Sequence, residues 1–174
     1  HKPHQITIEQ YLEMTRLKTG ALIRMAERIA CYLAGKEELE KDIVGFAELA
    51  GIAFQIKDDC LEFTASEKVF GKSFGNDVTE GKISLPVIFA LENSNTEAKK
   101  RLLEILSTHT RNKKTIKEFM AIISHSGAVE NSLKYADDLI EKAWAKIEHR
   151  LPAEKKKCLE DFKNITYSLV KTDK

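Results

Sequence analysis

The sequence predicts an all-α protein, built as a helical bundle. Only three prolines and eight glycines occur in 174 residues, so few positions favour turns over helices. Hydrophobic residues make up 43% of the chain and charged residues 32%, which is typical of a globular protein. A chain of this length can bury a substantial core, and we expect a single domain.

Charge and cysteine content argue against several classes of protein. The formal net charge is +1, which gives no reason to expect a nucleic-acid partner or an acidic membrane surface. The cysteines Cys31, Cys60 and Cys158 are odd in number and far apart, and no CxxC pair occurs. This pattern disfavours a disulfide framework or a zinc site. No apolar run approaches the ~20 residues that a membrane span needs. We therefore expect a cytoplasmic protein.

The first predicted helix runs from Ile8 to Leu33. Thr7 and Gln10 have the spacing of a capping box, and Gly35 is a typical stop after the helix. The tripeptide Lys18-Thr19-Gly20 lies inside the helix. Because glycine costs a helix about 1 kcal/mol relative to alanine, Gly20 indicates close approach of another backbone or a ligand. A surface lysine beside a tolerated glycine is the alternative.

The second predicted helix, from Glu37 to Phe63, carries an acidic face. Its later part is apolar almost all round, except for Gln55, Asp58, Asp59 and Glu62. At about 100° per residue, these four positions fall within an arc of roughly 100°. Carboxylates this close repel one another and need a compensating cation, either metal ions or lysines. A hard divalent cation, above all Mg²⁺, is the first hypothesis for this face.

Residues 64–83 are predicted to be one long irregular segment. Such segments in compact domains are usually functional or disordered. Two lysines in it each follow a glycine, at Gly71-Lys72 and Gly81-Lys82. Glycines let a backbone approach an anion closely, and lysines supply point charges for phosphate oxygens. The segment does not match a P-loop, and a plain surface loop remains the alternative.

The rest of the chain predicts outer and closing helices. They are expected at residues 86–92, 96–107, 113–124 and 128–150, with a last helix after Pro152 that runs to Val170. Asp137 and Asp138 form a second acidic pair, which we interpret as helix-surface charge. No role is assigned to His109, His125 or His149, because their spacing does not suggest ligands.

The order of these motifs resembles that of the trans-prenyl diphosphate synthases. The family's second aspartate-rich motif, FQxxDDxLD, corresponds to Phe54–Glu62, which reads FQIKDDCLE. The flanking GKxxGxD and EGKxTLP patterns correspond to Gly71–Asp77 and Glu80–Pro86. With the earlier KTG, the resemblance covers the chain from Tyr11 to Leu91. It implies an all-α bundle of the isoprenoid synthase type, of which residues 1–174 would be the C-terminal part.

The resemblance also implies a reaction. The family condenses an allylic diphosphate with isopentenyl diphosphate: the allylic carbon–oxygen bond ionises, the isopentenyl double bond attacks the cation, and a proton is lost. Ionisation needs charge neutralisation on the departing diphosphate, which Mg²⁺ and fixed lysines provide. A homodimer is expected on the same basis.

Individual roles follow from the matched positions. The metal would be held by Asp58, with Asp59 and Glu62 contributing through ordered water. Lys18 and Lys72 resemble the lysines that grip the allylic diphosphate, and Lys82 would assist them. Thr19 and Gln55 resemble polar groups near the reacting carbons. The catalytic set is therefore Lys18, Thr19 and Gln55.

Two departures from the family pattern matter. Glu62 stands where the motif usually ends in aspartate, a longer arm that still suits a metal. The first aspartate-rich motif, DDxxD, does not occur in the sequence, which begins at His1 without a methionine. We therefore expect a piece of a longer protein that is inactive alone. Two other readings are a non-catalytic helical subunit that modulates an active partner, and an unrelated bundle with a structural ion pair.

Overall fold

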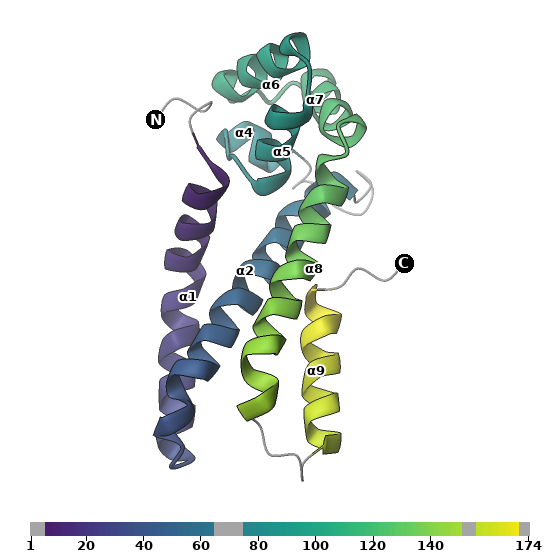
Figure 1. Cartoon of the computed structure of the whole chain (residues 1–174). Coiled ribbons are helices and arrows are strands. Elements are labelled where there is room, and N and C mark those ends of the chain that lie inside the picture. Colours follow the sequence, from purple (N-terminus) through teal and green to yellow (C-terminus); the bar gives the residue numbers. More distant parts are fainter. Residues whose placement is uncertain (1–5, 65–74, 151–155, 171–174) are drawn as a thin grey trace. The chain divides into compact units, whose positions relative to one another are not determined.

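The computed structural model describes residues 6–64, 75–150 and 156–170. Within these ranges every regular element is helical, so the predicted all-α fold class is confirmed (Figure 1). In chain order the helices are α1 (Ile8–Leu33), α2 (Glu40–Thr64), α4 (Asn76–Glu80), α5 (Leu85–Asn93), α6 (Thr96–Thr108), α7 (Lys113–His125), α8 (Ala128–Ile147) and α9 (Lys156–Val170). Short 3₁₀ turns precede α2 at Glu37–Leu39 and follow α8 at Glu148–Arg150.

The chain forms two compact units. One unit contains the described residues up to Tyr11 together with Asp58–Leu133, and we call it the acidic unit because it holds the aspartate pair. The other contains Leu12–Lys57 and the described residues from Lys134 onward, and we call it the long-helix unit. No helix in the described part of the chain is both long and apolar enough to cross a membrane.

Both ends of α1 form as the sequence predicts. The Thr7 backbone N–H donates to Gln10 Oε1 at 3.0 Å, and the Gln10 N–H donates to Thr7 Oγ1 at 3.3 Å, which completes the capping box. At the other end Gly35 adopts φ +60°, and the Lys36 N–H donates to the Cys31 carbonyl at 2.9 Å. A glycine in the left-handed region lets the chain leave the helix without strain.

Aromatic packing forms the centre of the long-helix unit. Phe46 of α2 lies edge-on to Trp144 of α8, with ring centroids 4.9 Å apart, and Phe162 of α9 lies 5.4 Å from Trp144. Gly51 provides the close approach between α1 and α2, since a Cβ there would lie 2.9 Å from Ile23 Cδ1. The sequence pointed to Gly20 for such a contact, but the surroundings of Gly20 lie outside the described residues.

One predicted boundary is wrong. Residues 64–83 were expected to be irregular throughout, yet α4 forms within them. Glycines in left-handed conformations bound this one-turn helix, Gly75 at φ +81° and Gly81 at φ +66°. Beyond its end, the Lys82 N–H donates to the Asp77 carbonyl at 2.8 Å. A five-residue helix held by its two ends has too little periodicity to be visible in the sequence.

Candidate functional site

The predicted site residues are divided between the two units. Asp58, Asp59, Glu62 and Lys82 belong to the acidic unit. The predicted catalytic residues Lys18, Thr19 and Gln55 belong to the long-helix unit. Lys72, predicted to bind diphosphate, lies outside the described residues.

Asp59 is the most deeply buried of the predicted site residues, with 1% of its side chain exposed. Both carboxylate oxygens are occupied. The Tyr11 hydroxyl donates to Oδ2 at 2.8 Å, and Lys82 Nζ donates to Oδ1 at 2.9 Å. A buried carboxylate is stable only when its charge and lone pairs are matched in this way.

Lys82 lies between two carboxylates. Besides Asp59, its Nζ is 3.0 Å from Asp77 Oδ2. Burial alone would lower the pKa of Lys82, but the hydrogen bond and charge of Asp59, together with the charge of Asp77, raise it above the ordinary lysine value. Lys82 therefore stays charged at neutral pH and acts as an internal counter-ion.

Glu62 also faces inward. Glu62 lies about one helical turn after Asp59 on α2. Its Oε1 accepts a hydrogen bond from the Asp77 backbone N–H at 3.2 Å. Burial, and then the negative charge of Asp77, raise the pKa of Glu62 to about 7. The side chain thus joins α2 to the start of α4.

The three predicted metal ligands do not form one cluster. Within the described ranges, no group of three or more His, Cys, Asp or Glu side chains is arranged to hold a metal ion. Asp59 has two donors already and does not fit as a direct ligand, whereas Asp58 is exposed. One or two carboxylates commonly suffice for Mg²⁺, which keeps several waters and binds substrate phosphates. A Mg²⁺ ion therefore fits at Asp58, and its presence stays a prediction.

The long-helix unit places the other predicted residues differently. Lys18 is exposed on α1, and Gln55 is half-buried on α2. Thr19 lines an apolar pocket of about 280 Å³. Its other walls are Ile23, Glu27, Phe46, Ala47, Ala50, Gly51, Phe54, Phe162 and Thr166. The pocket can hold a hydrocarbon group beside the Thr19 side chain.

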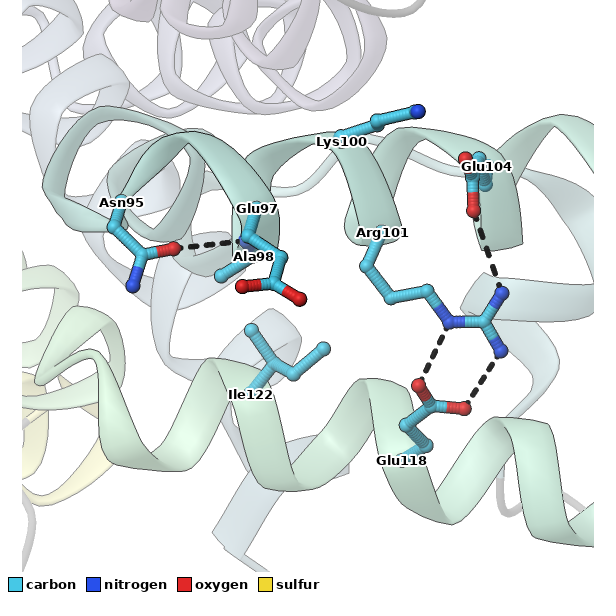
Figure 2. Close-up of a pocket in the computed structure, with 8 residues that line it drawn as sticks. All are labelled: Asn95, Glu97, Ala98, Lys100, Arg101, Glu104, Glu118 and Ile122. Atoms are coloured by element: carbon cyan, nitrogen blue, oxygen red, sulfur yellow. Dashed lines mark hydrogen bonds and ion pairs between the residues drawn. The ribbon is translucent and has the colours of Figure 1, made fainter.

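The acidic unit has a hollow of its own, which lies between α6 and α7 (Figure 2). Arg101 closes one side through paired hydrogen bonds to Glu118, both 2.7 Å long, and a weaker 3.5 Å contact to Glu104. The lining is polar and open, and none of the predicted site residues contributes to it. We interpret it as a solvent-exposed groove where the ion pair between Arg101 and Glu118 joins α6 to α7.

Sequence reasoning missed two members of the site. Tyr11 was quoted only as the first residue of the family resemblance, and Asp77 only as the last residue of the GKxxGxD pattern. Their side chains complete the contacts of Asp59 and Lys82. The sequence signal that could have identified them is their position, because each is a polar residue at the boundary of a segment that matches the family.

Comparison with known proteins identifies a family match and several similar proteins. It matches the polyprenyl synthetase family over residues 1–123. A short chain isoprenyl diphosphate synthase of Methanocaldococcus jannaschii is 40% identical over 121 residues, which are 69% of this chain and 37% of that protein. An all-trans-nonaprenyl-diphosphate synthase (geranyl-diphosphate specific) of Rhodobacter capsulatus is 36% identical over 148 residues, 85% of this chain and 45% of that protein.

The structural comparison agrees. Geranylgeranyl pyrophosphate synthetase from Pyrococcus horikoshii has a TM-score of 0.76 at 31% identity, over 97% of this chain and 50% of that one. The chain spans less than half the length of the curated relatives named above. The family match covers well over half of this chain, and the chain therefore belongs to the polyprenyl synthetase family.

Proposed function

We propose that the protein carrying this chain condenses an allylic prenyl diphosphate with isopentenyl diphosphate to make a longer all-trans prenyl diphosphate. The observation that carries the proposal is the acidic face of α2. Asp58 is exposed there, beside an aspartate fixed by Lys82 and Tyr11. A carboxylate presented at the surface can hold a metal ion that neutralises charge on a departing diphosphate. The relatives named prenyl diphosphate synthases support the same reaction class.

In this proposal, different residues of the chain bind the metal, bind the diphosphate and orient the substrate. Asp58 would hold a Mg²⁺ ion, which when bound neutralises charge on the leaving diphosphate. Lys18 is exposed on α1 and supplies a positive charge for diphosphate oxygens. Thr19 and Gln55 would orient the reacting end of the substrate. The apolar pocket that Thr19 lines would exclude water from the hydrocarbon. The homodimer and the cytoplasmic location stay predictions.

The test replaces Asp58 in the full-length protein. We expect Asp58→Ala to lower kcat by about 100-fold or more, because electrostatic stabilisation of the leaving group is lost. Helicity by circular dichroism should be unchanged, since Asp58 is exposed. Product formation would be measured with Mg²⁺ and both diphosphates.

The matched control is Asp138→Ala. Asp138 is also an exposed helix aspartate of an adjacent pair, and it lies on α8 outside the predicted site. It should keep near-normal turnover. Full activity of Asp58→Ala would contradict the role proposed for Asp58. No product from the unaltered full-length protein would contradict the proposed reaction and would favour the non-catalytic subunit.

A further inference from the structure

We propose that the apolar pocket of the long-helix unit is a binding site for an alkylammonium ion, that is, a hydrocarbon chain that ends in a positively charged amine. The hydrocarbon chain packs against the apolar walls of the pocket, and the ammonium group pairs with Glu27. This site is separate from the proposed reaction, because it depends on Glu27 and the pocket walls alone.

The walls of the pocket favour a hydrocarbon. Among the described residues that line it, Glu27 is the one ionisable side chain, and Phe46, Phe54 and Phe162 are its aromatic members. The pocket has a volume of about 280 Å³. At about 30 Å³ per heavy atom, the volume that a water molecule takes up in the liquid, this space holds about nine heavy atoms. A short alkyl chain with one polar end therefore fits.

Glu27 offers this ligand an unmet hydrogen-bond acceptor. Its Oε2 is buried and has no hydrogen-bond partner among the described residues. Burial, and then the negative charge of Glu48, raise the pKa of Glu27 to about 7, as expected for a carboxyl without a counter-ion. Because a buried unpaired carboxylate is costly, a ligand that brings a positive charge gains a charge-assisted hydrogen bond at Glu27.

The arginines closest to Glu27 in the sequence are already paired with other carboxylates. Arg24 pairs with Glu48, and Arg28 pairs with Glu40 at 2.8 Å. In the part of the chain that the structure describes, Glu27 itself forms no ion pair. The positive charge that Glu27 lacks is therefore a feature that a ligand can supply.

Other classes of ligand match this pocket less well. A plain hydrocarbon leaves Glu27 Oε2 unpaired, and a fatty-acid carboxylate is repelled by Glu27 and Glu48. A hard metal ion needs several oxygen ligands, whereas the described lining offers one carboxyl between apolar walls. A chain with a terminal ammonium satisfies both the walls and the carboxyl.

The experiment measures the binding of octylammonium, octan-1-ol and octanoate to the 174-residue chain by isothermal titration calorimetry at pH 8. These ligands have similar chain lengths and differ in the charge of the end group. Octylammonium should bind about tenfold more tightly than octan-1-ol, and octanoate should bind more weakly than the alcohol. Trp144 gives a second signal by fluorescence, because it is the single tryptophan of the chain and packs against Phe46 and Phe162 of the pocket.

Glu27→Gln is the decisive variant, because it keeps the size of the side chain and removes its charge. It should bind octylammonium about tenfold more weakly than the unaltered chain does, and octan-1-ol within about threefold of the unaltered chain. Glu37→Gln is the matched control, since Glu37 is an exposed glutamate of the same unit. It should bind all three ligands as the unaltered chain does, and circular dichroism checks the folding of both variants.

The pH dependence of binding tests the same pairing in the unaltered chain. Glu27 is mostly neutral at pH 5.5 and mostly ionised at pH 8, whereas an alkylammonium is charged at both. Octylammonium should therefore bind about tenfold more weakly at pH 5.5, and Glu27→Gln should lose this difference. The other charged groups near Glu27 are Glu48 and its partners Arg16 and Arg24, and the residues that α9 contributes to the pocket are uncharged.

Two results would overturn the proposed site. The first is equal affinity of the unaltered chain for octylammonium and octan-1-ol, because the pocket would then bind the hydrocarbon alone. The second is equal octylammonium affinity in Glu27→Gln and the unaltered chain, because the ammonium would then not pair with Glu27. Neither measurement depends on turnover, so the test of Asp58 and this test can fail independently.

Discussion

At the scale of single residues, burial changes what an acid can do. Asp59 is buried and stays charged because Lys82 and Tyr11 compensate it. Glu27 of α1 lines the apolar pocket of the long-helix unit, and its Oε2 is buried with no hydrogen-bond partner among the described residues. Burial, and then the charge of Glu48, raise the pKa of Glu27 to about 7. Glu27 is thus protonated over a range in which an exposed glutamate is ionised.

This shift predicts a pH-dependent stability. A carboxyl whose folded-state pKa is raised stabilises the fold below its unfolded pKa, and that stability is lost as pH rises through the folded value. Between pH 4.5 and about 7 the unaltered chain should therefore lose stability through Glu27. After allowance for solvent screening, the loss is about 1–2 kcal/mol. Glu27→Gln should remove it and be the more stable form at pH 8.

Urea unfolding at pH 5 and pH 8, followed by circular dichroism, measures the difference. Glu92→Gln is the control, because Glu92 is exposed at the end of α5. It should show the same pH dependence as the unaltered chain. An unchanged pH dependence in Glu27→Gln would mean that Glu27 is ionised in the folded state.

At the scale of elements, α1 has an exposed apolar face. The sequence suggested Leu22, Met25, Ile29 and Leu33 as apolar positions of this helix, yet Leu22 is 70% exposed and Leu33 is 78% exposed. The face comprises Met14, Leu17, Leu22, Met25, Ile29, Tyr32 and Leu33. At about 100° per residue these positions share one side of the helix, with Lys18 among them. A contiguous apolar patch of this kind is unusual on a soluble monomer.

The patch predicts dye binding. The 174-residue chain should increase the fluorescence of the hydrophobic dye ANS. Leu22→Gln/Leu33→Gln should reduce that increase by about half or more, with helicity unchanged, since both side chains are largely exposed. Ile165→Gln on α9 changes an exposed residue outside the patch and serves as control. Equal fluorescence from all three proteins would show that α1 does not form the hydrophobic surface.

At the scale of the whole molecule, the chain is short relative to its family. It spans 37% and 45% of the two curated relatives named above. The DDxxD pattern is absent from its sequence, and of the three predicted metal ligands only Asp58 is exposed. Ionising a diphosphate needs more positive charge than one such site collects.

We therefore expect no condensation by the isolated 174-residue chain. Purified chain with an intact mass of 19.7 kDa should give no prenyl product above the enzyme-free blank, with Mg²⁺ and both diphosphates present. The full-length protein, assayed in parallel, is the positive control. Product from a sample of that mass would show that the chain contains a complete site.

Local patterns in the sequence determined much of this structure. The capping box at Thr7 and the stop at Gly35 placed both ends of α1, because capping depends on residues three to five positions apart. The aspartate-rich motif with its glycine–lysine neighbours identified the family, since the motif is contiguous. The tertiary structure decided the direction of each charged side chain. Whether Asp58 or Asp59 faces inward depends on Tyr11 and Lys82, which are distant in sequence and meet Asp59 only through packing.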